Sequence, residues 1–324
     1  MKARARHLLI TVFIFSLILI HIYRRTVIKA DLVTPAQFPP NKGIFLVETT
    51  DTLEPTSLTL CAVESAARIY PDRPIFFYMG GLRKWNNPQE KHISHDLQVL
   101  TSLANVYIQP FDLEEILKDS PLLPWYLKVN PATEKFWTHV SSDASRLALV
   151  WKYGGIYFDT DVISIRPIPE EEFLVCAYTM THTSNGIFGF NQFQPFLWDC
   201  MKEFAVNYKG QQWGYQGPQL VTRVLQRLGQ LPKMDSGGGD SKFYNFSYLH
   251  PHRFYPIPPH SWEKFFEPWD PKYTFVGSYG LHFFNFMNYK KSKMIIGSNS
   301  LAERLYRQHC PNIYSREKEF SKLK

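Results

Sequence analysis

Short apolar segments alternate with helical segments in the first half of the sequence, and this alternation restricts the fold more than any other feature. Segments 44–47, 74–79 and 106–108 have the length and apolar character of buried strands, whereas 55–70 and 92–103 have helical periodicity. Strand, helix and strand in succession are typical of parallel sheets, because parallel neighbours need a crossover connection. We therefore expect an α/β domain with a mostly parallel central sheet and ligands at the carboxyl ends of its strands.

The excess positive charge is concentrated in residues 1–30. They contain six Lys and Arg and no acidic residue, which leaves 30 of the 36 basic residues against 29 acidic residues in the rest of the chain. A nearly neutral body argues against nucleic-acid binding. The apolar run 8–23 is expected to be a retained membrane anchor. A cleaved signal peptide is the alternative, but Arg24 and Arg25 stand where small residues would precede a cleavage site.

These features predict a single-pass type II membrane protein. Its expected parts are a cytosolic tail at 1–7, a transmembrane signal anchor at 8–23, a proline-containing stem at 24–42 and a luminal body at 43–324. The sequon at Asn245 is a candidate N-glycosylation site and agrees with a luminal body.

Four cysteines lie in the expected luminal body, namely Cys61, Cys176, Cys200 and Cys310. No pair has the CxxC spacing of a zinc site. One or two disulfides are expected in an oxidising lumen, and three pairings are possible if all four residues join.

A helix, a glycine pair and an apolar strand follow one another directly within residues 141–167. The serine pair at 141–142 is expected to cap the helix, and the glycine pair at 154–155 to end it. The strand expected at 156–158 follows at once.

Two pairs of charged residues belong to this segment. Asp143 and Arg146 are expected on the polar side of the helix, and Asp159 and Asp161 are expected to point the same way from an extended strand end. Adjacent carboxylates on an apolar strand need a counter-ion, and a hard divalent cation there would neutralise charge on a leaving diphosphate. A solvated surface motif and a calcium loop are the alternatives, but a calcium loop needs a glycine at fixed spacing where 162–163 is Val-Ile.

Further motifs lie on both sides of this segment. Together with it they are Phe45-Leu46-Val47-Glu48-Thr49, Cys61-Ala62-Val63-Glu64-Ser65-Ala66-Ala67-Arg68, Ser142-Asp143-Ala144-Ser145-Arg146, Asp159-Thr160-Asp161, Asn185-Gly186, Trp213-Gly214-Tyr215-Gln216-Gly217-Pro218-Gln219-Leu220, Phe254-Tyr255-Pro256-Ile257 and Cys310-Pro311. By these motifs and their order, the sequence resembles, from about Ile44 to Pro311, the α-1,4-glycosyltransferases of glycosyltransferase family 32, the group of α-1,4-galactosyl- and N-acetylglucosaminyltransferases.

The resemblance implies a GT-A-type nucleotide-sugar-binding fold, a UDP-sugar donor, Mn²⁺ and retention of anomeric configuration. By the same resemblance, Asp159 and Asp161 would serve the metal and the diphosphate. Asp143 and Arg146 would hold hydroxyls of the donor sugar, and the alternative for them is a weak surface ion pair.

Three more residues are candidates by the resemblance. His282 would be a metal ligand or contact the diphosphate, although Phe284 replaces the tryptophan that relatives carry two positions later; a core histidine is the alternative. Gln216 and Asn185 are expected near the acceptor and the reacting face of the sugar, where an amide steadies a charged transition state. The alternative for both is a loop residue that binds backbone groups.

The expected function is a Golgi membrane hexosyltransferase with a luminal catalytic domain. It would move a galactose-type or N-acetylhexosamine residue, α-linked, to a terminal sugar of a glycolipid or glycoprotein, and the membrane anchor favours glycolipids. A metal-dependent hydrolase of nucleotide-diphosphosugars and a non-catalytic, membrane-anchored sugar-binding protein are the alternatives.

Overall fold

The computed structural model describes residues 33–84, 95–234, 237–288 and 293–322. Internal contacts divide the chain into two units, Met1–Gln37 and Phe38–Lys324. The described part of the first unit contains the short 3-10 helix η1 (Pro35–Gln37). The expected tail and anchor lie outside the described residues, and no described helix has the length and apolar character that crossing a bilayer requires.

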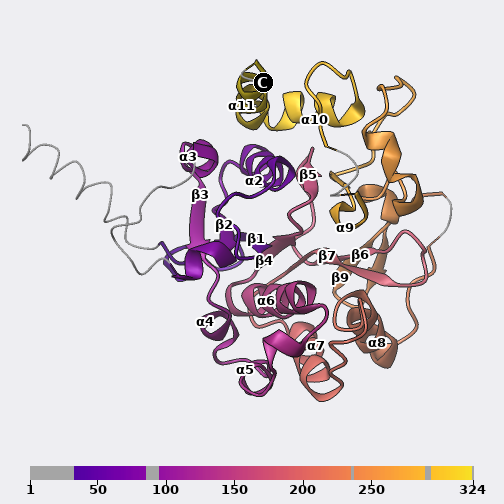
Figure 1. Cartoon of the computed structure of the whole chain (residues 1–324). Helices are drawn as coiled ribbons and strands as arrows, with labels where there is room; N and C mark the ends of the chain where they lie inside the picture. The colour runs from indigo at the N-terminus through magenta and orange to yellow at the C-terminus, as the bar shows by residue number, and fades with distance from the viewer. Residues whose placement is uncertain (1–32, 85–94, 235–236, 289–292, 323–324) are drawn as a thin grey trace, which may run out of the picture. The chain divides into compact units, whose positions relative to one another are not determined.

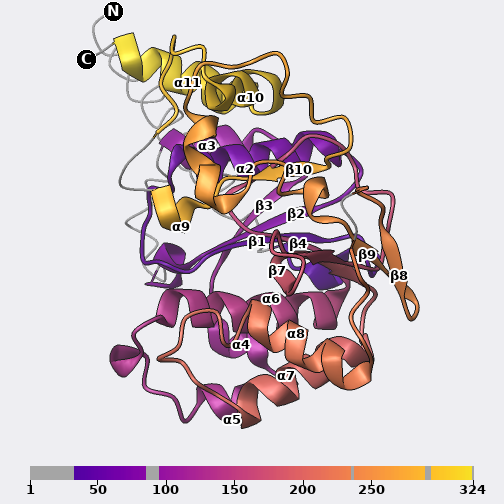
Figure 2. The same cartoon turned by 90° about the vertical axis from the view of Figure 1, so that its right-hand side faces the viewer.

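Phe38–Lys324 contains an eight-stranded sheet with the order β3-β2-β1-β4-β7-β6-β9-β8 (Figure 1; β8 is labelled in Figure 2). Its strands are β1 (Ile44–Glu48), β2 (Ile75–Met79), β3 (Val106–Pro110), β4 (Gly155–Phe158), β6 (Phe173–Cys176), β7 (Thr183–Phe190), β8 (Ser241–Phe243) and β9 (Phe246–Leu249). A second, two-stranded sheet pairs β5 (Val162–Ser164) with β10 (Gly280–His282).

The predicted parallel sheet is confirmed where strands and helices alternate. Strands β3, β2, β1 and β4 are parallel neighbours, and β6 and β9 form a fourth parallel pair. Three antiparallel pairs, β4 with β7, β7 with β6 and β9 with β8, complete the sheet. The sheet is therefore mainly parallel, and its antiparallel part is formed largely by β6, β7, β8 and β9, which were not predicted from the pattern of residues.

Two hydrophobic cores lie on opposite faces of this sheet. Ile44 and Leu46 of β1 belong to one core and Phe45 and Val47 to the other, because successive side chains of a strand point to opposite faces. Helices cover both faces (Figures 1 and 2). On one face lie α2 (Ser57–Ile69), α3 (His95–Thr101), α10 (Leu301–His309) and α11 (Pro311–Lys322). On the other lie α4 (Leu113–Leu117), α5 (Leu123–Tyr126), α6 (Trp137–Tyr153), α7 (Pro195–Val206) and α8 (Pro218–Leu228).

Shorter elements connect these helices and strands. They are the 3-10 helices η2 (Gly80–Lys84), η3 (Pro131–Thr133), η4 (Pro251–Arg253) and η5 (Pro259–Phe265), and the short helix α9 (Asn285–Asn288).

Helix α6 begins at Trp137, one turn before the serine pair, so the prediction that Ser141 and Ser142 cap it is wrong. Both hydroxyls are instead used inside the helix. Ser141 Oγ donates to the carbonyl of Thr138 at 3.2 Å, and Ser142 Oγ accepts from Arg146 Nη2 at 2.7 Å. The Ser141 bond is the one that serine commonly makes to the preceding turn of a helix.

The predicted end of α6 at the glycine pair is confirmed. Gly154 has a φ of 64°, which favours glycine, and a Cβ there would lie 2.0 Å from Asn41 Oδ1. A Cβ on Gly155 would lie 2.0 Å from the carbonyl oxygen of Gly43. The pair therefore lets the helix turn directly into β4.

A disulfide joins Cys61 on α2 to Cys310, which lies between α10 and α11. Cys176 and Cys200 are buried free thiols. Beside the disulfide, the fully buried Glu64 carboxylate accepts the backbone N–H groups of Asn312 and Ile313 at 3.0 and 2.9 Å. We call Glu64 and its partners the α11 clasp, because they hold the first turn of α11 against α2.

Candidate active site

Asp159, Asp161 and His282 converge just beyond the carboxyl end of β4. One ligand atom from each of the three lies within 4.8 Å of the others. The aspartates lie in a turn that leads into β5, not on an extended strand end as predicted, and the N–H of Val162 donates to the Asp159 carbonyl at 3.2 Å. The antiparallel pairing of β5 with β10 places His282 opposite Val162. The structure thus brings together the three predicted metal ligands.

The two carboxylate oxygens of Asp159 have different surroundings. Oδ1 accepts from Arg146 Nη1 at 3.0 Å and from the hydroxyl of Tyr157 at 2.9 Å. Oδ2 faces Gly186 and His282, and a Cβ on Gly186 would lie 2.4 Å from it. Any side chain at position 186 would therefore displace the carboxylate, and Oδ2 is the oxygen left for a ligand.

Backbone groups orient the other two residues of the cluster. The N–H of Asn285 donates to Asp161 Oδ2 at 2.7 Å. The N–H of Phe284 donates to His282 Nδ1 at 3.1 Å, which turns Nε2 toward Asp161 Oδ1 at 3.4 Å and Asp159 Oδ2 at 3.7 Å. A neutral ring that accepts at Nδ1 carries its proton on Nε2, so Nε2 becomes a metal ligand only when that proton is displaced.

Asp143 and Arg146 lie on the buried face of α6, so the prediction that they occupy its polar side is wrong. They are 8% and 6% exposed, and Arg146 Nη2 lies 3.5 Å from Asp143 Oδ1. Asn185 bonds to both residues. Its side-chain Nδ2 donates to Asp143 Oδ1 at 2.6 Å, and its backbone carbonyl accepts from Arg146 Nη1 at 2.8 Å. Arg146 therefore links Asp143 and Asn185 to Asp159.

Burial and charge set the protonation of this cluster. Burial raises the pKa of Asp143 to about 6, although Arg146 partly opposes the shift. Burial would also raise the pKa of Asp159, but Arg146 and then His282 hold it below its usual value. Burial raises the pKa of Asp161 despite the attraction of His282. Three carboxylates thus share one guanidinium and one imidazole, and this arrangement favours a cation.

Burial acts on the pKa values of the two basic groups in the opposite direction, but neighbouring carboxylates outweigh it. Burial would lower the pKa of Arg146, but Asp159 and the neighbouring carboxylates raise it above its usual value. Burial would likewise lower the pKa of His282, but Asp161 and then Asp159 raise it. Both basic groups are therefore held by the carboxylates around them.

Gln216 is buried, and both polar atoms of its amide are bonded to the backbone. Nε2 donates to the carbonyl of Phe204 at 2.8 Å, and Oε1 accepts the N–H of Lys209 at 3.2 Å. These bonds correspond to the alternative of a backbone-binding loop residue. The next residue, Gly217, is the one that reaches the cluster, since a Cβ there would lie 2.8 Å from Asp143 Oδ2.

Sequence reasoning missed Tyr157 and Gly186 as site residues. Tyr157 was recognisable, because it lies two positions before Asp159 and strand side chains repeat every second residue. Gly186 was not, because its contact with Asp159 depends on the antiparallel pairing of β4 with β7.

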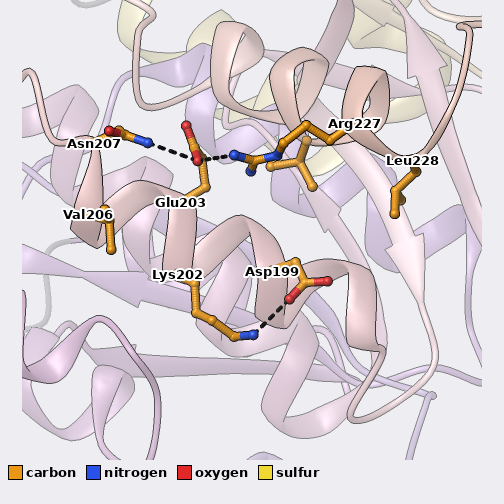
Figure 3. Close-up of a pocket in the computed structure, with 8 residues that line it drawn as sticks. Asp199, Lys202, Glu203, Val206, Asn207, Arg227 and Leu228 are labelled. Atoms are coloured by element: carbon orange, nitrogen blue, oxygen red, sulfur yellow. Dashed lines mark hydrogen bonds and ion pairs between the residues drawn. The ribbon is translucent and has the colours of Figure 1, made fainter.

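A separate cavity of about 440 Å³ lies between α7 and α8 (Figure 3). It is lined by Asp199, Lys202, Glu203, Val206, Asn207, Val224, Arg227 and Leu228. None of the predicted site residues lines it. Its central carboxylate, Glu203, is already bonded to Asn207 at 3.0 Å and to Arg227 at 2.5 Å. The charge in this cavity is therefore balanced within the protein.

Comparisons with known proteins place this geometry in a family. A model of the "Glycosyltransferase sugar-binding region containing DXD motif" matches residues 56–179, and a model of the "Alpha 1,4-glycosyltransferase conserved region" matches residues 189–317. The chain is 47% identical to human α-1,4-N-acetylglucosaminyltransferase over 274 residues, which cover 84% of this chain and 80% of that protein. The chain belongs to the α-1,4-glycosyltransferase family.

Other relatives are more distant. Human lactosylceramide 4-α-galactosyltransferase is 33% identical over 294 residues, covering 89% of this chain and 81% of that protein. Among solved structures, the PaToxG glycosyltransferase has a TM-score of 0.46 at 20% identity, covering 64% of this chain and 76% of that one. The predicted resemblance to the α-1,4-glycosyltransferases is confirmed, and the chain is an enzyme of the glycosyltransferase class. Its predicted α/β fold with a mainly parallel central sheet is confirmed by the strand pairing.

Proposed function

We propose that this α-1,4-glycosyltransferase moves a galactose-type or N-acetylhexosamine residue from a UDP-sugar to a terminal sugar of a glycolipid or glycoprotein, with retention of configuration. The supporting observation is the convergence of Asp159, Asp161 and His282 beside the buried network of Asp143 and Arg146. In this proposal, the ligands for a cation lie next to side chains suited to binding sugar hydroxyls.

The cation site would be formed by Asp159, Asp161 and His282, and Mn²⁺ suits this set of two carboxylates and one imidazole. When bound there, a divalent cation neutralises charge on the leaving diphosphate. Arg146 and the Tyr157 hydroxyl hold Oδ1 of Asp159, so that Oδ2 is the oxygen that stays directed into the cluster. These contacts orient the carboxylate before any substrate arrives.

Asp143 and Arg146 would bind hydroxyls of the donor sugar, and the amide of Asn185 would lie beside its reacting face. No carboxylate takes the position of a covalent nucleophile in this assignment. The acceptor oxygen forms its bond to the anomeric carbon on the face from which the phosphate oxygen leaves. The proton of the acceptor hydroxyl passes to that phosphate oxygen, which balances the reaction.

A donor and acceptor panel tests this function. The purified 43–324 body is incubated with UDP-N-acetylglucosamine, UDP-galactose or UDP-N-acetylgalactosamine, with Mn²⁺ or EDTA. Lactosylceramide and a glycoprotein with terminal galactose serve as acceptors. UDP-N-acetylglucosamine comes first because the relative at 47% identity is named for that sugar. We expect metal-dependent transfer of an α-linked sugar, read by mass spectrometry and linkage analysis.

Two outcomes would contradict the proposal. Release of sugar at the same rate with and without acceptor would indicate a nucleotide-diphosphosugar hydrolase. Binding of UDP-sugar without turnover on any acceptor would indicate a non-catalytic sugar-binding protein.

We also propose a Golgi location, with residues 8–23 as the anchor and the body in the lumen. Asn245, the predicted glycosylation site, is exposed in the turn between β8 and β9, where an oligosaccharide can attach without disturbing a core. In cells, endoglycosidase treatment should increase the mobility of the wild type and leave Asn245→Gln unchanged. Equal mobility of the two untreated proteins would contradict the luminal orientation.

A further inference from the structure

Three aromatic side chains form a partly exposed cluster, which we call the aromatic platform (His139, Trp213 and Phe286). The rings of Trp213 and Phe286 are stacked, with centroids 5.6 Å apart and an interplanar angle of 22°. His139 meets Phe286 edge to face at 5.1 Å. Trp213 is 49% exposed and Phe286 is 54% exposed. Large apolar side chains that gather in solvent mark a binding surface more often than a single exposed residue does.

Two residues of the platform belong to segments that contain or contact Asp143. His139 precedes Asp143 by four residues on α6, so their side chains lie on the same side of the helix. Trp213 lies in the turn before α8, and the end of that turn, Gly217, packs against the Asp143 carboxylate.

The third ring is tied to the cation ligands. Phe286 directly follows Asn285, whose N–H donates to Asp161 Oδ2 at 2.7 Å. Both belong to α9, which follows β10 and His282. The platform is therefore assembled from the three segments that also hold the acidic cluster, and it lies at the solvent-exposed rim of the site.

The exposed surface of Trp213 suits a flat partner. Phe286 stacks on the indole, and about half of the Trp213 surface is still exposed, which leaves surface for contact with a second ring. A pyranose ring has a face made of C–H groups and carries its hydroxyls around the edge. It can therefore cover an indole while the hydroxyls stay hydrated.

We propose that the aromatic platform binds the terminal sugar ring of the acceptor by stacking on Trp213. This inference rests on the proposed glycosyl transfer. The donor is assigned to the buried charged groups, since its diphosphate needs them. The acceptor must instead enter from solvent and present one hydroxyl to the site, which the rim position of the platform allows. A lipid chain would require an extended apolar surface, whereas the platform has one indole and one phenyl ring beside a polar imidazole.

Trp213→Ala and Trp213→Phe test the platform, with Phe193→Ala as a matched control. Phe193 is 57% exposed and also contacts an aromatic ring edge-on, that of Trp151 at 5.2 Å. It follows Phe190, which pairs with Gly155 at the start of β4, whereas the cluster lies beyond the other end of that strand. The variants are compared by thermal unfolding first, so that only folded proteins are assayed.

The acceptor chosen by the panel is then assayed both as a glycolipid and as its lipid-free oligosaccharide. We expect Trp213→Ala to raise the KM for both acceptor forms by about tenfold or more, with the donor KM unchanged. Trp213→Phe should have an acceptor KM close to that of the wild type, and Phe193→Ala should leave the acceptor KM unchanged. The proposal is overturned if the acceptor KM is unchanged, if the donor KM rises equally, or if only the glycolipid is affected.

A binding measurement separates this inference from the proposed function. Lactose is titrated into the protein with UDP and Mn²⁺, and tryptophan fluorescence is followed. If the wild type transfers no sugar to any acceptor, the proposed function fails. A lactose-dependent change that Trp213→Phe abolishes would still support the platform as a saccharide site, and the absence of any such change would overturn it.

Discussion

Two regions of the molecule contain buried carboxylates, and they differ in how many hydrogen-bond donors each carboxylate receives. In the α11 clasp, Glu64 is fully buried and receives a donor from Arg68 Nε at 2.8 Å as well as two backbone N–H groups. In the candidate active site, Asp159 and Asp161 face each other across His282, and one oxygen of Asp159 has no strong donor of its own.

The difference separates carboxylates that hold the fold from carboxylates that await a ligand. A buried carboxylate whose oxygens all accept hydrogen bonds makes the folded state more stable than the same carboxylate would without those partners. Clustered carboxylates repel each other, and they are retained where a ligand relieves the repulsion. Variants of the two regions should therefore affect activity and stability in opposite proportions.

The largest expected effect is on turnover. Asp161→Asn should lower kcat by about a hundredfold to a thousandfold, because it removes a cation ligand that stabilises the leaving group. The free energy of unfolding should stay the same or rise, since one of two adjacent carboxylates is gone. Steady-state kinetics with Mn²⁺ and urea unfolding measure the two quantities. Wild-type turnover in this variant would remove Asp161 from the cation site.

Glu64→Ala should show the reverse pattern. It leaves Arg68 and two N–H groups at the start of α11 without their acceptor, and we expect a loss of about 4 kcal/mol in the free energy of unfolding. The kcat of the folded fraction should be unchanged. The exposed Glu54→Gln is the control and should leave the unfolding curve where it is. A large loss of kcat in folded Glu64→Ala would break the comparison between the regions.

The pH dependence of stability should distinguish Asp143 from Asp159, because the pKa of Asp143 is raised and that of Asp159 is held below its usual value. Burial raises the pKa of Asp143 from 3.8 to about 6, so between these values the folded state binds a proton that the unfolded state has released. As pH rises through this window, the wild type should lose about 3 kcal/mol relative to Asp143→Asn. Urea unfolding at pH 4 and pH 7 measures the difference. A wild type that gains stability over this range relative to the variant would contradict the assignment.

The smallest loss of stability is expected for a variant of Gln216, a residue predicted to act in catalysis but bonded to the backbone in the structure. Gln216→Ala removes two hydrogen bonds to backbone groups and should lower the free energy of unfolding by about 1 to 2 kcal/mol. If its role is to hold the loop, turnover should fall only slightly. A fall in kcat of more than about tenfold without a loss of stability would instead place the amide among the reacting groups.

The sequence predicted those parts of the fold and site that depend on local pattern. The position of β2 and the end of α6 at Gly154 follow from strand length and glycine chemistry. The acidic pair could be placed because it follows an apolar strand directly. The contacts of Gly186 and Gly217 could not, because they depend on pairings between segments distant in the chain.

The burial of Asp143 and Arg146 shows the same limit. Charged residues three positions apart on a helix suggest an exposed face, and only the sheet packed against α6 reveals that this face points inward. The same packing buries Ser141 and Ser142, which lie inside α6 because the helix begins at Trp137. Burial is ordinarily predicted from apolar residues, so a site whose chemistry requires buried charged residues is predicted wrongly as exposed.

The bond between Cys61 and Cys310 also orders events during synthesis. The two thiols are 249 residues apart, so at about 5 to 20 residues per second Cys61 waits roughly 10 to 50 s for its partner to be made. Cys176 and Cys200 emerge earlier and compete for it. Their burial in the opposite core removes that competition only if the sheet forms before the chain is complete. A mutation that slows assembly of the sheet would therefore first produce chains with wrongly paired cysteines, even when the correctly folded protein is stable.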